Sequence, residues 1–444
     1  MADKPHVVII GGGFGGLYAA QALNRAPVRI TLIDKSNHHL FQPLLYQVAT
    51  AGLSPGDIAE PIRTILRHQR NVHVLMAEVI DIDVDARQVH LADDDPIGYD
   101  HLILATGATH TYFGNDQWSD LAPGLKSLEN AVSIRKQFLT AFEEAERTKD
   151  KALRRKLLTF VIIGGGPTGV ELAGTMAEMA RQALPRDFDN IAPDDARVIL
   201  LEGSPRVLKV YPEELSAKAQ KALEDRGVEV RTKSRVTEID NDGVFIKEER
   251  VEAANVFWAA GVQGNPLGRC LGAPTTKRGL VKVNPDLTIP DHPEVFVVGD
   301  LAQLTDAEGK YVPGVAQGAI QMGQYAARVI RSRVAGKAAP KPFVYKDKGS
   351  MATIGRAAAV AMVGKRQFSG WFAWLMWLAV HLLFLIGFDN RLIVLIQWTW
   401  YYFSYKQGTR LITASYKGHE NPRLNPAMAA YEVGSAEQET EATV

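Results

Sequence analysis

Apolar positions along the chain gather in short runs that lead directly into glycine. Two such runs are Val7–Ile10 and Phe160–Ile163, and small residues with helical spacing follow the glycines in both cases. A short, continuous apolar run bounded by glycine is typical of a strand buried on both faces of a parallel sheet. The pattern therefore predicts two buried strands, each followed by a tight turn and a helix. The predicted helices cover Leu17–Leu23 and Val170–Ala177.

Each of these two units continues with a second apolar strand that ends in an acid. The first is Val28–Ile33, followed by Asp34, and the second is Val198–Leu201, followed by Glu202. Strands that alternate with helices predict an α/β fold, here with two Rossmann-like dinucleotide-binding domains. Three further apolar runs close the units, at Leu102–Leu104, Val256–Trp258 and Val295–Val298.

The order of these elements predicts that one domain is inserted into another. We expect residues 1–113 and 275–335 to form one discontinuous domain, and residues 114–274 to form a second domain inserted into it. Residues 336–444 form a C-terminal region whose polar tail, Glu432–Val444, is expected to be disordered because it has few large apolar residues. The length of 444 residues agrees with about three domains at ~150 residues each.

The glycine-rich stretches, Gly11–Gly16 and Gly164–Gly169, both have the spacing G-x-G-x-x-G. The first glycine permits the tight turn, the second lets the backbone approach a pyrophosphate, and the third lets helix and strand pack closely. The N-terminus of the helix then offers free N–H groups to the phosphates. One fingerprint is weak evidence, but two, each with a later acid, predict two dinucleotide sites. The alternative is glycine-rich turns that bind no ligand.

The acids that follow the fingerprints select the nucleotide. Asp34 lies 23 residues after the first glycine of its fingerprint, near the ~20 expected for an acid that binds an adenosine ribose. Glu202 lies 38 residues after its own, because a polar loop intervenes. A carboxylate accepts a hydrogen bond from a 2′-hydroxyl and repels a 2′-phosphate, which favours NADH over NADPH. Arg206, four residues later, weakens that preference.

Composition excludes several classes of function. Lys plus Arg and Asp plus Glu both number 50, so the formal net charge is zero and nothing attracts nucleic acid in general. The one cysteine, Cys270, cannot form an intramolecular disulfide, a CxxC redox pair or a cysteine-rich metal site. The sequence has no HxH or HExxH pattern, so we expect no metal centre.

Residues 371–405 differ from the rest of the chain, with five of the seven Trp and 12 of the 36 aromatic residues. Trp371–Phe388 is an uncharged run of 18 residues, the lower limit for a spanning helix, and Leu392–Phe403 is shorter. Asp389–Arg391 predicts a polar turn between them. Trp-rich helices suit the headgroup level of a bilayer, so we expect a monotopic membrane anchor. A single span and a buried helix pair are the alternatives.

Several motifs resemble those of known flavoproteins. The first fingerprint with Asp34, together with Ala105-Thr106-Gly107, Gly299-Asp300 and the second fingerprint, resembles the flavoprotein reductases with two dinucleotide-binding domains, which are glutathione-reductase-like. More specific stretches are similar to the type II, non-proton-pumping NADH:quinone oxidoreductases, bacterial members above all. These stretches are His38–Ala49, Gly164–Glu171, Val315–Gln321 and Lys346–Gly355.

The resemblance implies non-covalently bound FAD, NADH as substrate and membrane quinone as electron acceptor. It implies that residues 1–113 and 275–335 are the FAD-binding domain and that residues 114–274 are the NADH-binding domain. It implies a peripheral protein on the cytoplasmic face of the bacterial inner membrane, in contact with the bilayer surface, and raises the expectation of a homodimer. The residues expected at FAD are Gly11, Gly13, Phe14, Gly15, Gly16, Asp34, Lys35, Ala105, Thr106, Gly107, Gly299, Asp300, Ala316 and Gln317. Those expected at NADH are Gly164, Gly166, Pro167, Thr168, Gly169, Glu171, Glu202, Ala260 and Gly261.

Three residues are expected to be catalytic: Glu171, Gln317 and Gln321. Glu171 opens the second fingerprint helix, where a carboxylate suits the helix dipole. The resemblance implies instead that it handles protons or positions the nicotinamide. Gln317 and Gln321 are four residues apart and share a helix face, which could simply face solvent. The resemblance implies that Gln317 lies beneath the flavin, where N–H groups stabilise negative charge, and that Gln321 points into the quinone channel.

Two other functions stay open. A soluble NADH-dependent ferredoxin or rubredoxin reductase would lack the aromatic C-terminus and would show a basic docking patch. A redox-sensing relative of apoptosis-inducing factor would form a long-lived charge-transfer complex with NADH and turn over slowly. Disulfide reductases and sulfide:quinone oxidoreductases are excluded, since both need more redox cysteines than this sequence contains.

Overall fold

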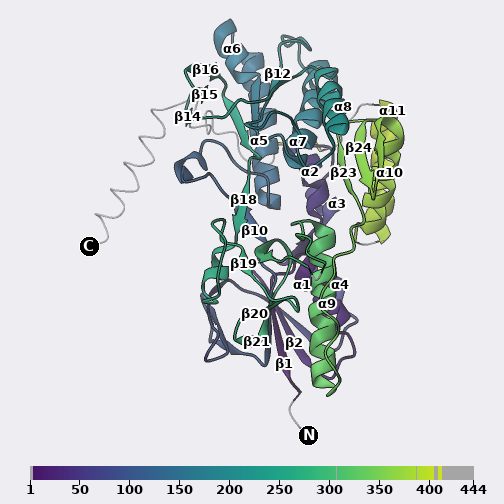
Figure 1. Ribbon diagram of the computed structural model, residues 1–444. Helices are drawn as coiled ribbons and strands as arrows, with labels where there is room; N and C mark the ends of the chain where they lie inside the picture. The colour runs from purple at the N-terminus through teal and green to yellow at the C-terminus, as the bar shows by residue number, and fades with distance from the viewer. Residues whose placement is uncertain (1–3, 307, 387, 405–408, 413–444) are drawn as a thin grey trace, which may run out of the picture. The chain divides into compact units, whose positions relative to one another are not determined.

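The computed structural model describes residues 4–306, 308–386, 388–404 and 409–412 (Figure 1). The predicted disordered tail, Glu432–Val444, lies outside these residues. The chain divides into two compact units. Unit 1 comprises Met1–Leu40, Ala59–His110 and Val262–Lys348, and unit 2 comprises Phe41–Ile58, Thr111–Gly261 and Gly349–Val444.

Unit 1 is built around a six-stranded sheet with the order β20-β21-β9-β1-β2-β5. Five strands run parallel and β20 is antiparallel at one edge. Counted along the chain, the parallel strands have the order 3-2-1-4-5, which is the doubly wound arrangement of a Rossmann-like domain. The strands are β1 (His6–Ile10), β2 (Arg29–Asp34), β5 (Val72–Met76), β9 (His101–Leu104), β20 (Thr288–Ile289) and β21 (His292–Val297).

Two helices of unit 1, α1 (Phe14–Ala22) and α9 (Ala316–Val334), pack against each other. They approach closely because Gly323 has no side chain, and a Cβ there would lie 2.1 Å from the carbonyl oxygen of Gly15. The smaller elements of the unit are α4 (Ile62–Leu66), η5 (Pro266–Arg269), η6 (Gly299–Leu301), β3 (His38–Leu40), β4 (Ala59–Pro61), β6 (Val79–Asp83), β7 (Gln88–Leu91), β8 (Ile97–Gly98), β10 (Ala108–His110), β18 (Val262–Gly264), β19 (Val281–Lys282) and β22 (Ala302–Gln303).

Unit 2 repeats the same order in a four-stranded parallel sheet, β13-β12-β11-β17. Its strands are β11 (Thr159–Ile163), β12 (Arg197–Leu201), β13 (Val228–Arg231) and β17 (Asn255–Trp258). Around it lie η1 (Gln42–Leu44), α2 (Leu45–Ala49), α3 (Pro55–Ile58), η2 (Asp116–Trp118), α5 (Leu128–Arg147), α6 (Lys151–Leu157), α7 (Pro167–Glu178), η3 (Met179–Ala183), η4 (Leu184–Arg186), α8 (Glu213–Glu224), β14 (Glu238–Asp240), β15 (Gly243–Ile246) and β16 (Glu249–Glu252).

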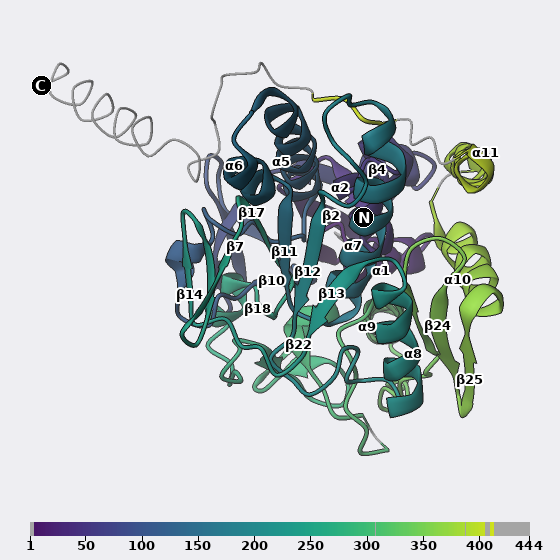
Figure 2. The ribbon, with the colours of Figure 1, turned by 90° about the horizontal axis from the view of Figure 1, so that it is seen from above.

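The C-terminal part of unit 2 begins with an antiparallel sheet of β23 (Ser350–Thr353), β24 (Ala359–Val363) and β25 (Arg366–Ser369). Helix α10 (Gly370–Phe384) packs on this sheet, as Figure 2 shows, and α11 (Phe388–Ser404) follows. Among the described helices, none has both the length and the apolarity that a membrane span requires.

The predicted polar turn at Asp389–Arg391 is wrong, because these residues lie inside the first turn of α11. The chain leaves the helix earlier, at Leu385, which has an extended backbone. Arg391 Nε donates to the carbonyl oxygen of Leu385 at 2.7 Å, and Asn390 Nδ2 donates to that of Ile386 at 3.3 Å. The side chains of Asn390 and Arg391 therefore bind carbonyl groups of the connection between α10 and α11, and the residues themselves are helical.

The two units do not follow the predicted domain bounds everywhere. Residues 41–58 and 349–444 belong to unit 2, and residues 262–274 belong to unit 1. Helix α2 lies in unit 2 because it packs against α5 and α7. Such packing joins segments that are far apart along the chain, and the order of strands and glycines does not report it.

Candidate functional site

The first fingerprint loop of unit 1 needs glycine at two positions for the chain's own packing. Gly11 has a φ of +102°, and a Cβ there would lie 2.5 Å from the carbonyl oxygen of Ala105. A Cβ on Gly16 would lie 1.9 Å from the carbonyl oxygen of Gly11. Gly13 differs, because a Cβ there would meet no described atom within 4 Å. The middle glycine therefore borders open space, where a phosphate group can approach the backbone.

The second fingerprint loop, in unit 2, repeats this geometry. Gly164 has a φ of +115°, and a Cβ there would lie 2.5 Å from the carbonyl oxygen of Ala259. A Cβ on Gly169 would lie 1.8 Å from the carbonyl oxygen of Gly164, while one on Gly166 would again meet no described atom within 4 Å. Pro167 and Thr168, the predicted nucleotide contacts at the start of α7, are exposed.

The acid at the end of the second strand closes each loop in the same way. Asp34 accepts a hydrogen bond from the N–H of Gly12 at 2.6 Å and one from the N–H two residues after it at 2.7 Å. Glu202 accepts from the N–H of Gly165 at 2.7 Å and from the N–H two residues after it at 2.6 Å. Each carboxylate oxygen has a further lone pair. Both acids can therefore hold the loop and still accept from a ribose hydroxyl.

Several buried polar atoms of unit 1 lack a hydrogen-bond partner among the described residues, and two of them belong to predicted FAD residues. Thr106 Oγ1 and Gln317 Oε1 are buried and have no hydrogen-bond partner among the described residues. Buried polar groups are nearly always hydrogen-bonded, so these two atoms fit a bound polar ligand. His39, in one of the stretches that carry the family resemblance, adds a third unpartnered atom in its Nε2, while its Nδ1 pairs with the carbonyl oxygen of Gly12 at 2.8 Å.

The remaining predicted FAD residues of unit 1 have mixed surroundings. Phe14 packs edge-on against the ring of His39, with 5.0 Å between centroids. Gly299 has a φ of +75°, which favours glycine, and Asp300 beside it is half-buried. Lys35 is exposed. The structure places Gly107, Gly15, Ala105 and Ala316 in the same unit.

Gln321 of α9 is bound differently from Gln317. Its Nε2 donates to the carbonyl oxygen of Lys346 at 3.0 Å, and its Oε1 accepts from the N–H of Lys346 at 3.0 Å. The amide therefore holds the segment around Lys346, and its predicted place in a quinone channel stays a prediction. In unit 2, Gly261 is explained by packing, since a Cβ there would lie 2.8 Å from the ring of Phe113, and Ala260 precedes it.

Glu171 of α7 is half-buried and lies in an unusual electrostatic setting. Its Oε1 accepts one long hydrogen bond, 3.4 Å, from the N–H of Thr353. Burial raises the pKa of Glu171 to about 8, and the Thr353 hydrogen bond opposes the shift. Burial raises the pKa values of Tyr46 and Tyr211, and the nearby carboxylate of Glu171 raises them further. Near neutral pH the side chains of Glu171, Tyr46 and Tyr211 are therefore protonated.

Thr353 and Tyr46 are functional candidates that sequence reasoning missed. Both lie in stretches that resemble the quinone oxidoreductases, but neither was given a role. Thr353 is 182 residues from Glu171 along the chain. A side-chain pattern could not have found it, because Thr353 contributes a backbone N–H.

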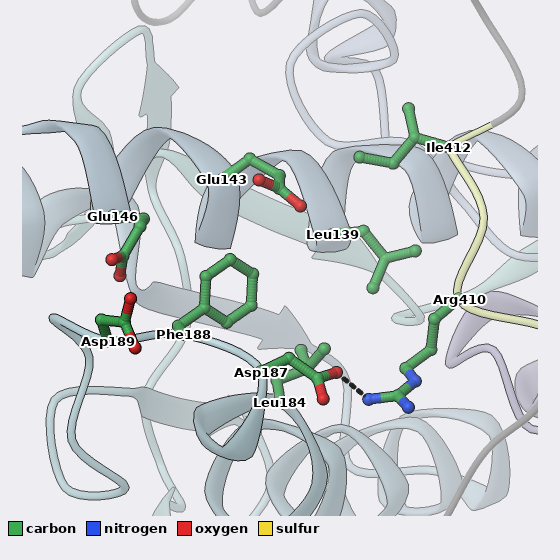
Figure 3. A pocket seen from close by; sticks show the side chains of 9 residues that line it. All are labelled: Leu139, Glu143, Glu146, Leu184, Asp187, Phe188, Asp189, Arg410 and Ile412. Atoms are coloured by element: carbon green, nitrogen blue, oxygen red, sulfur yellow. Dashed lines mark hydrogen bonds and ion pairs between the residues drawn. The ribbon is translucent and has the colours of Figure 1, made fainter.

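Unit 2 also has a hollow of about 320 Å³ away from its fingerprint loop (Figure 3). Four carboxylates line it, and one of them, Asp187, forms an ion pair with Arg410. This excess of negative charge repels a pyrophosphate, so the hollow does not fit a dinucleotide. The lining residues are Leu139, Glu143, Glu146, Leu184, Asp187, Phe188, Asp189, Arg410 and Ile412. Among the described residues, no cluster of His, Cys, Asp and Glu could hold a metal ion.

Known proteins that resemble this chain belong to a family of dinucleotide-dependent oxidoreductases, which agrees with the two fingerprint loops. Residues 5–323 match the family described as pyridine nucleotide-disulphide oxidoreductase. The structure of NDH2 from Plasmodium falciparum in complex with NADH has the same fold, with a TM-score of 0.84 at 20% identity, covering 93% of this chain and 100% of that one. The chain thus has the fold of the pyridine nucleotide-disulphide oxidoreductases.

Two relatives from Mycobacterium tuberculosis narrow this class. The type II NADH:quinone oxidoreductase NdhA is 49% identical over 430 residues, which cover 93% of this chain and 90% of NdhA. The type II NADH:quinone oxidoreductase Ndh is 48% identical over 424 residues, which cover 92% of this chain and 90% of Ndh. The chain therefore belongs to the type II NADH:quinone oxidoreductase family, and the family prediction made from the motifs is confirmed.

Proposed function

We propose that the protein is a peripheral membrane flavoprotein that oxidises NADH and reduces membrane quinone to quinol without pumping protons. The observation that carries this proposal is the paired geometry of the two fingerprint loops, in a chain 49% identical over 430 residues to a type II NADH:quinone oxidoreductase. One chain with two such loops can hold a resident dinucleotide and a visiting one. In this proposal unit 1 binds FAD and unit 2 binds NADH.

Several atoms of unit 1 fit FAD. Asp34 would accept from the adenosine ribose, and the open backbone at Gly13 would lie against the pyrophosphate. The unpartnered oxygens of Thr106 and Gln317 would find polar partners on the flavin, and Asp300 would accept from a ribityl hydroxyl. Bound non-covalently in this way, FAD would supply a group that accepts a hydride and returns two electrons.

In unit 2, Glu202 would accept from the ribose of NADH and disfavour a 2′-phosphate. Gly166 and the N-terminus of α7 would face the pyrophosphate. Reduction of a quinone to quinol takes two electrons and two protons. Glu171, whose pKa is raised to about 8, holds a proton at neutral pH and would supply it to the reduced quinone.

The outer face of α11 supports contact with a bilayer surface. Leu392, Ile396, Trp400 and Phe403 lie along one side of the helix, spaced by four, four and three residues, and all are exposed, by between 49% and 77%. Contiguous exposed apolar side chains are typical of surfaces that bind a membrane or a protein. We propose that this stripe and the exposed aromatic residues of α10 rest on the cytoplasmic face of the inner membrane as a monotopic anchor. The same proposal includes pairing of two chains, as the family resemblance implies.

Steady-state kinetics test this function against its alternatives. The purified protein should show a flavin spectrum, release FAD on denaturation, and oxidise NADH rapidly with a short-chain quinone. A ferredoxin or rubredoxin reductase would turn over rapidly only with its protein acceptor. A redox sensor would form a stable charge-transfer band and turn over slowly. Release of FMN, or a folded protein without flavin, would exclude the proposed function.

A further inference from the structure

Glu178, at the C-terminal end of α7, is a buried carboxylate with partners from three other segments. Its side chain is 6% exposed. Its Oε1 accepts from Arg226 Nε at 3.2 Å and from the N–H of Arg356 at 2.8 Å, and its Oε2 accepts from the hydroxyl of Tyr401 at 3.3 Å. A buried carboxylate with this many partners fixes the positions of the segments that bind it.

The segment 353–356 is held on α7 at both ends. Glu171 and Glu178 are seven residues apart, so they lie on one helix face, about 10.5 Å apart along the axis. The N–H of Thr353 donates to Glu171, and the N–H of Arg356 donates to Glu178. Between them, a Cβ on Gly174 would lie 3.0 Å from the backbone of this segment. The segment therefore runs closely along α7 from one carboxylate to the other.

Helix α11 is attached at the same point. Arg356 Nη1 donates to the carbonyl oxygen of Tyr402 at 2.5 Å, and its guanidinium lies 5.3 Å from the centre of the Tyr402 ring. Arg226 Nη2 donates to the carbonyl oxygen of Arg356 at 2.6 Å. The aromatic helix and the segment 353–356 therefore share their attachment to α7.

We propose that Glu178 is a positioning residue which, by holding the segment 353–356, keeps the N–H of Thr353 on the carboxylate of Glu171 and so sets the pH range over which Glu171 passes its proton. The N–H of Thr353 stabilises the charged form of Glu171 more strongly than the neutral form, because a carboxylate is the better hydrogen-bond acceptor. The contact is long, at 3.4 Å, so a small displacement of the segment abolishes it. The inference rests on the proposed function, which gives the proton of Glu171 to the quinone.

Two titratable groups on other described elements interact with Glu171 and bear on its pKa. From other elements, Tyr46 of α2 and Tyr211 interact with it electrostatically, and burial raises the pKa of both. Around Glu178 lie the two arginines, Tyr401 and again Tyr46. Glu178 itself is a carboxyl group on the same helix as Glu171, and burial raises its pKa while Arg226 and Arg356 oppose the shift. A test must therefore separate the effect of the charge of Glu178 from the effect of the hydrogen bonds that its side-chain length allows.

Two substitutions make this separation. Glu178→Asp keeps the charge but withdraws the carboxylate by one C–C bond, about 1.5 Å, and so breaks the 2.8 Å contact with the N–H of Arg356. Glu178→Gln keeps the length and an acceptor oxygen but removes the charge. If Glu178 acts by holding the segment 353–356, Glu178→Asp should change the pKa of Glu171 more than Glu178→Gln does. If Glu178 acts only through its charge, Glu178→Gln alone should change that pKa.

The readout is the pH profile of flavin reoxidation by a short-chain quinone, measured by stopped flow in the intact holoenzyme. The wild-type rate should fall above the pKa of Glu171, which is raised to about 8. This fall in rate at high pH is the alkaline limb of the profile. Glu178→Asp should move the alkaline limb to higher pH by about one unit, because the charged form of Glu171 loses its hydrogen bond from Thr353. An unmoved limb, or one moved to lower pH, would overturn the proposal. Tyr401→Phe, which removes a weaker contact, should give a smaller shift in the same direction.

A matched control separates positioning from general loosening of unit 2. Glu229→Asp makes the same chemical change in another ion-paired glutamate, which binds Arg197 at 2.6 Å. It should leave the limb in place. In a Glu171→Gln background, Glu178→Asp should cause no shift, since the titrating group is gone. A shift that persists there, or that the control reproduces, contradicts the proposal.

The same pKa can be read without turnover. The pH dependence of the unfolding free energy, compared between pairs of proteins with and without Glu171→Gln, reports the pKa of Glu171 in the folded state. If the wild type fails to reduce quinone, the proposed function fails. The unfolding data still decide whether Glu178→Asp raises the pKa of Glu171. A loss of stability with an unchanged pKa would show that Glu178 is merely structural.

Discussion

Two glutamates of unit 2 illustrate how surroundings set chemistry at the scale of the residue. Glu202 accepts two short backbone hydrogen bonds, at 2.7 and 2.6 Å, which stabilise its charged form beside the second fingerprint loop, where we propose that it binds a ribose. Glu171 accepts one long hydrogen bond at 3.4 Å, and burial favours its neutral form. One is therefore suited to recognition and the other to proton transfer, although their side chains are identical.

Replacing Glu202 tests nucleotide selection. We expect the wild type to prefer NADH to NADPH by roughly 10²-fold in kcat/KM, since a carboxylate facing a 2′-phosphate costs a few kcal/mol. Glu202→Gln should narrow this preference, because the repulsion is removed. Arg206, whose Nη1 is buried without a partner among the described residues, offers the matched control. Arg206→Gln should widen the preference, and equal kcat/KM values in the wild type would contradict the assignment.

Glu171→Gln tests the pKa through stability. The folded-state pKa of Glu171, about 8, lies above its ordinary value of 4.5, so the folded protein binds more protons between these pH values. This contribution to stability is fully present below about 4.5 and is lost as the pH rises through 8. Denaturant unfolding should show that the wild type loses roughly 1–2 kcal/mol more than Glu171→Gln over this range, less than the full shift, because the half-buried group is partly screened. Parallel profiles would place Glu171 at an ordinary pKa.

Gln317→Ala tests the predicted contact with the flavin. In the proposed site the Gln317 amide would stabilise charge on the reduced flavin, so its removal should slow reoxidation by quinone roughly tenfold or more, with a smaller effect on reduction by NADH. Stopped-flow traces of the two half-reactions measure both rates. Gln324→Ala, two helical turns further along α9, is the control and should change neither. An effect confined to reduction by NADH would remove Gln317 from the quinone reaction.

At the scale of elements, the strands and helices around the glycine loops could be predicted, because local sequence determines them. β1, β11 and α7 each lie within a few residues of their predicted bounds. The apolar runs and the glycine sterics are local signals that need no distant partner. The start of α11 could not be predicted, since Asn390 and Arg391 look like turn residues until the carbonyl groups they bind are known. Contacts such as Thr353 with Glu171 join residues 182 positions apart, and only the folded chain reveals them.

A pair of glycine substitutions separates folding from binding in the first fingerprint. Gly16→Ala would place a Cβ 1.9 Å from a backbone oxygen, so helix and strand must move apart, and we expect a loss of several kcal/mol in stability. Gly13→Ala meets no described atom within 4 Å and should keep nearly the wild-type stability. It should nevertheless hold less FAD, because the new methyl group occupies the approach of the pyrophosphate. Thermal unfolding and FAD content measure the two effects. If a stable Gly13→Ala protein still binds FAD fully, the pyrophosphate does not lie against Gly13 and the assignment is wrong.

At the scale of the whole molecule, the aromatic C-terminal helices are part of unit 2 and not an appendage. Trp398 Nε1 donates to Gln47 Oε1 of α2 at 2.8 Å, and Thr409 Oγ1 donates to the carbonyl oxygen of Ala51. Val394 and Trp398 are buried, while Trp400 is 65% exposed. Deleting the helices would therefore uncover buried groups of unit 2. Substitutions on the exposed side test membrane binding without that damage.

Changing the exposed stripe of α11 should release the protein from membranes. Each large apolar side chain moved from water into an apolar layer contributes ~1.5–3 kcal/mol, so Ile396, Trp400 and Phe403 together contribute roughly 5–9 kcal/mol. Replacing all three with Ser should lower the partition coefficient onto anionic vesicles, measured by sedimentation, by more than a hundredfold, since 1.4 kcal/mol is a factor of about ten in an equilibrium constant. Val210→Ser, at another site of unit 2 that is 70% exposed, should change nothing.

Activity gives the second half of this last prediction. Oxidation of NADH with ferricyanide, which needs no membrane, should persist in the triple variant, because the substituted side chains face away from the buried side of α11. Turnover of a long-tailed quinone in vesicles should fall sharply, because such quinones stay in the bilayer and the enzyme does not. If the triple variant still sediments with vesicles, the anchor lies elsewhere. If it loses FAD or melts at a lower temperature instead, the stripe supports the fold, and contact with lipid is not its function.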